Sequence, residues 1–274
     1  MSNKEASLRI PETLRKVNNI IGVFSAKGGV GKSEISLNLA LSLNDKGYSV
    51  GLVDADIYGP SQPLLLGASS EEIEVKDKEL LSPLIKDNIK FMSMGLIAKE
   101  RMPVIWRGPM VSGAVMQLLS QTNWQELDYL IIDTPPGTGD VQLTLLQRMP
   151  LNATIVVTTP QKVAVSDTRK GIEMINKLKI PILGLVENMS YFHPSNSTDK
   201  YYIFGKGGGE ELANEYGLEL FTQIPLTEKE ESSHLYYKNS YKKIFDNLSS
   251  KVIDKLNSLG KEMNQTIPQM PSNE

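Results

Sequence analysis

One ten-residue stretch constrains the fold of this chain more than any other part of the sequence. Residues 25–34 read SAKGGVGKSE and lie between an apolar run, NIIGVFSA, and the helix-like run SEISLNLALSLN. Glycines let successive backbone N–H groups point at phosphate oxygens, and a helix N-terminus adds its dipole. A glycine-rich turn with a lysine on it would not need the order of strand, loop, Lys-Ser and helix. We therefore predict a phosphate-binding loop.

The loop predicts the groups that hold a nucleotide and its metal. Lys32 would supply a point charge to the phosphates, and the Ser33 hydroxyl would be a ligand of Mg²⁺. One position departs from the usual pattern, because Ala26 stands in place of the first glycine and Lys27 follows it at once. The nucleotide-binding residues that we expect are Gly28, Gly29, Val30, Gly31, Lys32, Ser33 and Glu34.

Apolar runs that predict strands alternate with helix-like stretches along the chain. This order implies an α/β fold, a doubly wound and mainly parallel sheet with helices on both faces. The predicted strands are NIIGVFSA, YSVGLVDAD, IKFMSMGLI, LDYLIIDTPPG, NATIVVTTP, PILGLVENMS and LFTQIPL. The predicted helices include SEISLNLALSLN, GPMVSGAVMQLLSQ, GGGEELANEYG and SDTRKGIEMINKLK, the last with Ser166 or Asp167 as its cap.

Residues 239–259 predict an amphipathic helix, whose apolar stripe is Phe245, Leu248, Val252 and Leu256. This run also carries acids and has no further apolar anchor, so packing on the domain is favoured over membrane binding. We expect an N-terminal segment at 1–17, a single P-loop ATPase domain at 18–260 and a disordered tail at 261–274.

Composition excludes several classes of function. The 274 residues include no cysteine, which rules out a disulfide scaffold and any thiolate-bound metal or cluster made by this chain alone. The net charge of −3 does not indicate the basic surface that nucleic-acid binding needs. No apolar run approaches the roughly 20 residues of a membrane helix, and no signal peptide is apparent. We expect a cytoplasmic protein that binds neither nucleic acid nor membrane.

Carboxylates follow two of the predicted strands. Asp54 and Asp56 end YSVGLVDAD, and Asp133 ends the apolar part of LDYLIID. The carboxyl ends of parallel strands form the ligand side of such sheets. Asp133 would hold a magnesium-bound water, and of the other two acids one can order Mg²⁺ and the other the attacking water. The alternative for Asp54 and Asp56 is a carboxylate bonded to backbone at a strand end. For Asp140 we favour a cap of the helix that begins VQLTLLQ.

The segment KGGVGKS resembles the deviant Walker A motif of the MinD, ParA and nitrogenase iron protein class of P-loop ATPases. The resemblance implies that Lys32 binds the chain's own ATP and that Lys27 reaches the ATP of the second subunit in a homodimer. It assigns water positioning to Asp56 and a place near the metal to Asp54. It also assigns recognition of adenine to Asn188 in VENMSY, with backbone around Pro225 as the other wall. A solvated Lys27 and a buried, satisfied Asn188 are the alternatives.

Longer segments resemble a narrower group, the Mrp/ApbC family of ATPases that carry iron–sulfur clusters to apoproteins. The resemblance covers about 19–225, through DADIYGPSQPLLLG, WRGPMVSGAVMQLL, YLIIDTPPGTGDVQLTL and ENMSYF with IFGKGGGEELA. Cluster-carrying members have a C-P-x-C motif after the segment that matches MSYF. Here Pro194 and Ser197 stand at the cysteine positions, and neither can replace a thiolate on iron. We favour the interpretation of His193 as an ordinary loop residue, and the same interpretation applies to His234.

Two functions are compatible with a chain that has the predicted ATPase residues and lacks the cluster-binding cysteines. The first is a Mg²⁺-dependent, slow ATPase of the iron–sulfur assembly family, a nucleotide-gated homodimer with apoprotein or assembly partners. The alternative is a cysteine-free, MinD- or ParA-like ATP switch that recruits protein partners and carries no cluster. A non-catalytic scaffold is disfavoured because the catalytic residues are present. Trp106 and Arg107 could contact a partner, the dimer mate or a phosphate, or form a structural Trp with a salt-bridged Arg.

Overall fold

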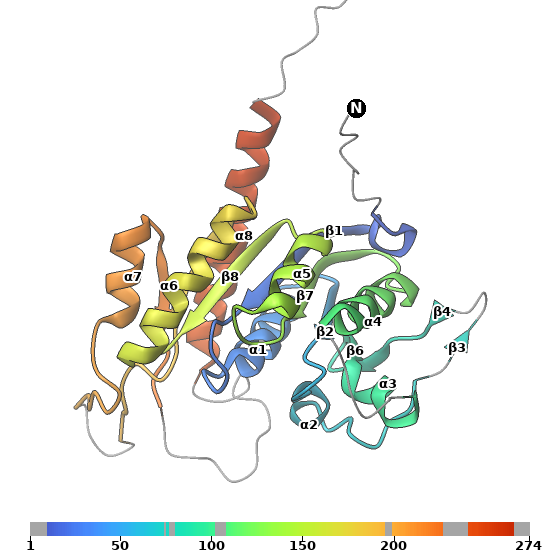
Figure 1. The fold of residues 1–274 in the computed structure, drawn as a ribbon, viewed down its shortest axis with the longest axis horizontal. Coiled ribbons are helices and arrows are strands. Elements are labelled where there is room, and N and C mark those ends of the chain that lie inside the picture. Colours follow the sequence, from blue (N-terminus) through green and yellow to red (C-terminus); the bar gives the residue numbers. More distant parts are fainter. Residues whose placement is uncertain are drawn as a thin grey trace, which may run out of the picture.

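The computed structural model describes residues 10–73, 75–76, 80–101, 108–194, 199–226 and 241–265. In these ranges one eight-stranded sheet has the order β10-β9-β8-β1-β7-β2-β6-β5 (Figure 1). All its neighbouring strands are parallel except β5 and β6. The strands are β1 Val17–Phe24, β2 Val50–Asp54, β5 Leu84–Lys86, β6 Ile89–Ser93, β7 Leu127–Asp133, β8 Ala153–Thr158, β9 Ile182–Glu187 and β10 Leu220–Gln223. Two further strands, β3 Val75–Lys76 and β4 Leu80–Leu81, pair with each other.

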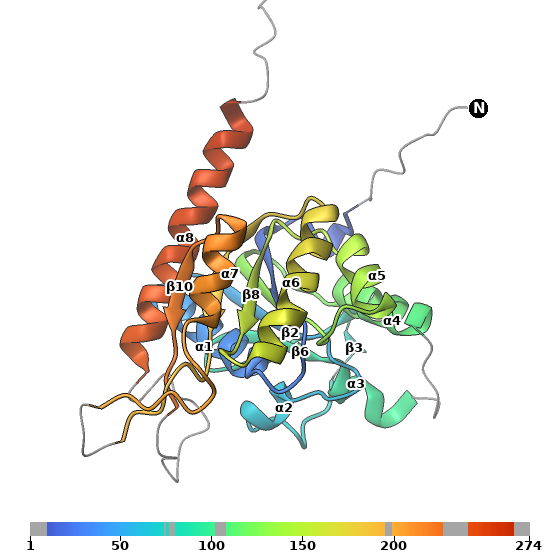
Figure 2. The ribbon, with the colours of Figure 1, turned by 60° about the vertical axis from the view of Figure 1, so that its left-hand side comes forward.

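Helices cover both faces of this sheet, as Figures 1 and 2 show. Helices α1 and α8 pack on one face, and α4, α5, α6 and α7 pack on the other. The helices are α1 Lys32–Asp45, α2 Gln62–Leu65, α3 Met94–Arg101, α4 Gly108–Gln121, α5 Asp140–Arg148, α6 Lys162–Lys177, α7 Gly208–Tyr216 and α8 Lys242–Gln265, after a short 3₁₀ turn at Glu12–Leu14. The predicted doubly wound α/β fold is confirmed.

The central strands are apolar throughout because both of their faces are covered. Every residue of β2 and β8 is buried. Alternate residues of one strand enter different cores: Ile131 packs with α1 and α8, and Ile132 packs with α4, α5 and α6. Burial of a large aliphatic side chain stabilises the fold by about 1.5–3 kcal/mol. Two cores on opposite faces therefore fix the register of the sheet.

The register brings the predicted site residues to one edge. Asp133 of β7 is paired with Asp54 of β2 on one side and with Val23 of β1 on the other. The phosphate loop follows β1 directly, and Asn188 follows β9. Since these strands are parallel, the loop, the carboxylates and the asparagine lie at the carboxyl edge of the sheet.

Helix α8 confirms the amphipathic interpretation of the C-terminal run. Phe245, Leu248 and Val252 are buried in the core with α1, and Leu256 is partly buried against it. The helix continues to Gln265, so the first five residues of the predicted disordered tail are helical instead. In the described ranges no helix combines the length and apolarity needed to cross a membrane.

Two other predicted boundaries are wrong. The strand predicted as IKFMSMGLI stops at Ser93, whose hydroxyl accepts the backbone N–H of Gly95 and starts helix α3. Helix α6 begins at Lys162, so Ser166 and Asp167 lie inside it rather than capping it. Gln161 is the cap residue of α6. Its backbone carbonyl accepts the N–H of Val165 and closes the first turn, and its side chain makes no capping bond.

Candidate nucleotide site

The phosphate loop connects β1 to α1 with two left-handed glycines. Gly29 has φ 79° and Gly31 has φ 81°, a region that favours glycine. A Cβ atom on Gly31 would also lie 2.2 Å from Nδ2 of Asn188, so a larger residue would displace the Asn188 side chain. Gly28 and Gly29 are exposed, whereas Val30 is buried and anchors the loop in the core with α1. Helix α1 begins at Lys32 with its N-terminus toward the loop, the arrangement that binds phosphate.

Lys32 is buried and pairs with the carboxylate of Asp133. Its ammonium contacts Oδ1 of Asp133, and the two side chains are 6% and 0% exposed. The Ser36 hydroxyl lies 3.2 Å from the same oxygen. A buried ion pair of this kind is stable only as a pair, because either charge alone would be desolvated without compensation. Lys32 therefore offsets the charge of Asp133 at the carboxyl edge of the sheet.

Asp54 is a second fully buried carboxyl group beside this pair. Oδ1 accepts the N–H of Asp56 at 3.1 Å, and Oδ2 accepts the N–H of Gln62 and the Ser93 hydroxyl, each at 3.1 Å. Burial, and next the charge of Asp133, raise the pKa of Asp54 to about 7. The backbone bonds agree with the alternative interpretation of Asp54 as a strand-end carboxylate.

The donor set at this edge fits Mg²⁺. Asp54, Asp133 and the Ser33 hydroxyl carry hard oxygens of the kind that Mg²⁺ prefers, and Mg²⁺ needs few protein ligands because it keeps several waters. In the described residues no group of three or more His, Cys, Asp and Glu side chains could hold a metal by itself. The site therefore suits a metal held jointly with substrate phosphates rather than an all-protein cage.

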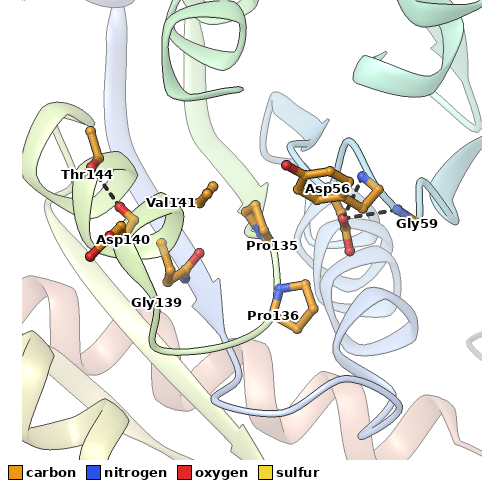
Figure 3. A pocket seen from close by; sticks show the side chains of 10 residues that line it. Asp56, Gly59, Pro135, Pro136, Gly139, Asp140, Val141 and Thr144 are labelled. Atoms are coloured by element: carbon orange, nitrogen blue, oxygen red, sulfur yellow. Dashed lines mark hydrogen bonds between the residues drawn. The ribbon is translucent and has the colours of Figure 1, made fainter. Parts of the chain in front are cut away.

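Asp56 lies at the rim of the site rather than inside it. Its Oδ1 accepts the backbone N–H groups of Tyr58 and Gly59, each at 3.1 Å. It lines a pocket of about 770 Å³ between the loop after β2 and the start of α5, and Pro135 and Pro136 of the loop after β7 also line this pocket (Figure 3). The carboxylate is partly exposed and faces this pocket, so a water molecule can reach it.

Asp140 lies across the same pocket from Asp56 (Figure 3). It was predicted to cap α5, but it is the first residue of that helix and Gly139 occupies the cap position. Gly139 at the cap position has no side chain to bond to the first turn, and Asp140 lies within that turn. An acid in the first turn still interacts favourably with the helix dipole.

Lys27 is half-buried in the phosphate loop, next to the exposed Gly28. Among the described residues, no hydrogen bond or ion pair is found for its ammonium group; its backbone carbonyl accepts the Ser25 hydroxyl at 3.0 Å. The first lysine of the loop thus differs from Lys32, which is bound to Asp133.

A cavity of about 80 Å³ lies beside the loop and brings three predicted residues together. Glu34, Asn188 and Pro225 all line it, although they come from α1 and from the loops after β9 and β10. Nδ2 of Asn188 donates to the carbonyl of Val30 at 2.9 Å, which agrees with the alternative of a satisfied asparagine. The Pro225 carbonyl accepts the Tyr241 hydroxyl at 3.0 Å. Burial raises the pKa of the Glu34 carboxyl group.

Three buried polar residues of this edge were not predicted from the sequence. Asn38 lines the cavity beside Asn188. Gln62 bonds to both Ser33 and Asp133. Glu187 accepts hydrogen bonds from Ser190 Oγ at 2.8 Å, from Gln223 Nε2 at 3.0 Å and from the N–H of Gly209 at the start of α7. In the sequence, the signal for Gln62 and Glu187 is that each is a polar residue next to an apolar run.

Other predicted residues bear less on the site. The backbone N–H of His193 donates to Leu226 at 3.1 Å, and Pro194 follows it. Trp106, Arg107, Ser197 and His234 lie outside the described residues.

Comparison with known proteins identifies the family. Residues 16–258 match the ParA family described as NUBPL iron-transfer P-loop NTPase. The chain is 49% identical over 223 residues to the iron-sulfur cluster carrier protein of Pseudomonas fragi, covering 81% of this chain and 77% of that protein. It is 49% identical over 210 residues to the carrier protein of Escherichia coli K12, covering 77% of this chain and 57% of the longer relative.

Solved structures agree with this result. The nucleotide-binding protein of Archaeoglobus fulgidus, in complex with ADP, is 36% identical with a TM-score of 0.70, covering 88% of this chain and 90% of that one. The cell division ATPase MinD of Pyrococcus furiosus is 21% identical with a TM-score of 0.60, covering 86% of this chain and 99% of that one. This second likeness shows the fold alone.

Proposed function

The chain belongs to the NUBPL iron-transfer P-loop NTPase family, and from this premise we propose that it is a Mg²⁺-dependent ATPase of iron–sulfur cluster assembly. We propose further that it acts as a nucleotide-gated homodimer in the cytoplasm. The observation that carries the proposal is the buried ion pair between Lys32 and Asp133 directly behind the phosphate loop. The ADP complex of the similar Archaeoglobus protein supports an adenine nucleotide at this loop.

Each polar group of the edge would have a distinct task in hydrolysis. The ammonium of Lys32 would leave Asp133 for the β- and γ-phosphates, and Asp133 would then be free to hold a metal-bound water. Ser33 and Asp54 would complete the metal site. A bound Mg²⁺ would neutralise phosphate charge. Asp56, at the rim of the open pocket, would orient the attacking water.

The base would bind in the cavity that Asn188, Glu34 and Pro225 line. Lys27, half-buried in the loop, would reach the phosphates bound by the second subunit of a dimer. Turnover would then depend on dimer formation, and hydrolysis would separate the subunits. This is the sense in which we propose nucleotide gating.

The absence of cysteine favours a second candidate function. The 274 residues contain no thiolate ligand, and Pro194 stands at the first cysteine position of cluster carriers. A chain of this kind could be an ATP switch that recruits apoprotein or assembly partners without carrying a cluster itself. The partner would then supply the thiolates that iron requires.

Two measurements test the proposal and separate the candidates. Steady-state hydrolysis of MgATP should be measurable in the wild type and absent in Lys32→Ala, since the variant lacks the charge at the phosphates. Unchanged turnover in the variant would reject the assigned site. Anaerobic reconstitution with iron and sulfide should then leave no bound iron if the chain is a switch. Stoichiometric iron on the re-isolated protein would instead favour cluster carriage through ligands other than cysteine.

A further inference from the structure

Four buried side-chain polar atoms have no hydrogen-bond partner in the described part of the chain. They are Asn38 Oδ1, Gln62 Oε1, Gln142 Oε1 and Thr159 Oγ1. Most buried polar groups are paired in native proteins, so each exception calls for a reason. Gln62 is the one of these that bonds directly to residues of the proposed metal site.

The orientation of the Gln62 amide is fixed by its neighbours. Nε2 donates to the carbonyl oxygen of Ser33 at 2.8 Å and to Oδ2 of Asp133 at 2.9 Å. Both partners are acceptors, so only the NH₂ group of the amide can face them. Oε1 is then the atom left without a partner, and the side chain is fully buried at 0% exposure.

Gln62 is also tied to the third predicted metal ligand. Its backbone N–H donates to Oδ2 of Asp54 at 3.1 Å, and its carbonyl accepts the N–H of Leu66 in the only turn of α2. One residue therefore bonds to Ser33, Asp54 and Asp133, which come from three different elements of the fold.

We propose that Oε1 of Gln62 accepts a hydrogen bond from a water molecule bound to Mg²⁺, which makes Gln62 a positioning residue of the metal site. The inference rests on the proposed function. Mg²⁺ keeps several waters, and each of these waters needs acceptors around it. Groups that bond to metal-bound ligands and waters orient them and strengthen metal binding. The buried acceptor beside Asp133 has the right chemistry and place for this task.

The same contact would connect the metal to the loop after β2. Gln62 is the first residue of α2, eight residues after Asp54 and six after Asp56. A bond from Oε1 to the metal's water shell would hold α2 against the site whenever Mg²⁺ and nucleotide are present. Loss of Mg²⁺ would release that bond but leave both Nε2 bonds in place.

This difference allows a test that separates Oε1 from the Nε2 contacts. The dissociation constant of ADP is measured by calorimetry in EDTA and at saturating Mg²⁺ for the wild type and for Gln62→Leu. The Nε2 bonds are lost under both conditions, so only the Mg²⁺-dependent increase in affinity reports on Oε1. We expect this increase to be about ten-fold smaller in the variant, the size of one hydrogen bond to a charged group.

Two further variants serve as a control and as a replacement for Gln62→Leu. Thr122→Val removes a buried hydrogen bond to Leu118, 2.7 Å long, at the end of α4 and far from the carboxyl edge, and should keep the full Mg²⁺ effect. Gln62→Met, closer in shape to glutamine, repeats the measurement if the leucine variant folds poorly.

The outcomes are distinct. An unchanged Mg²⁺ effect in both Gln62 variants overturns the proposal, as does an equal loss of ADP affinity with and without Mg²⁺, which would leave Gln62 a structural clamp. A wild type that binds no ADP under either condition would reject the proposed function itself, and this inference with it.

Discussion

Lys32 should stabilise the nucleotide-free protein as well as bind phosphate, and Lys32→Met tests this. The substitution keeps an unbranched side chain of similar length but removes the charge that pairs with Asp133. Asp133 would then be a fully buried carboxylate next to Asp54, which is also fully buried. Removing one partner of a buried ion pair typically costs about 3–5 kcal/mol. We therefore expect the free energy of unfolding to fall by about that amount at pH 8.

The loss should depend on pH. The pKa of Asp54 is raised from 3.8 to about 7, and the positive charge of Lys32 is one of the influences that lower it. Between those two values the folded state binds more protons than the unfolded state, so this group makes the protein less stable as pH rises. Removing Lys32 raises the pKa further. As pH falls, the free energy of unfolding of the variant should therefore rise by about 1.4 kcal/mol for each pH unit over which its folded state holds one additional proton.

Urea denaturation followed by circular dichroism at pH 5 and pH 8 measures both effects. Lys242→Met is the matched control, because Lys242 pairs with Asp45 at 2.9 Å with both side chains 49% exposed. Exposed pairs contribute about 0–1 kcal/mol, and this loss should hardly differ between pH 5 and pH 8. Equal losses in the two methionine variants, or a larger Lys32→Met loss at pH 5 than at pH 8, would show that the pair of Lys32 with Asp133 does not stabilise the fold in this way.

Three further predictions concern single residues. Lys27→Ala should reduce ATP hydrolysis far more than ATP binding, measured by turnover and calorimetry on the same sample; loss of binding alone would place Lys27 at its own subunit's nucleotide. Asp56→Asn should lower kcat while the affinity for ATP stays within about two-fold, because it removes a group that orients water; an unchanged kcat would assign Asp56 to the loop structure alone. Glu187→Gln should lower the free energy of unfolding by about 1–3 kcal/mol, since one amide oxygen and one NH₂ replace two acceptors that bond to Ser190, Gln223 and Gly209; a neutral effect in urea denaturation would count against that network.

The phosphate loop and the carboxylates could be predicted because their signals are local. Glycine at positions 29 and 31 provides the left-handed conformation that the loop needs. Asp54 and Asp133 each end a buried parallel strand, and the register of the sheet then sets them side by side. Pattern along the chain was enough to place these groups at one edge.

The boundaries of several elements could not be predicted in the same way. The segment after Phe91 is apolar apart from Ser93, and the bond from the Gly95 N–H to the Ser93 hydroxyl marks the end of the strand. Helix α6 starts through backbone closure at Gln161, without the capping side chain that sequence rules look for. At the first boundary the signal is one serine within an apolar run, and at the second the backbone closure leaves no distinct residue type.

Gln62 and Glu187 show a different limit. Gln62 bonds to Asp133, which is 71 positions away along the chain, and Glu187 bonds to Gln223, which is 36 positions away. The meaning of such residues depends on the tertiary partners that the fold brings to them. A single sequence shows only that a polar residue stands near an apolar run.

We propose that the loop at residues 25–33 binds an adenine nucleotide through Lys32. Isothermal titration of ADP with Mg²⁺ into wild type and Lys32→Ala, each first shown to be folded by circular dichroism, tests it most directly. We expect one ADP per chain for the wild type and no measurable binding for the variant, because the phosphates lose their charged partner. Equal affinity in both proteins, or no binding to the folded wild type, would contradict it.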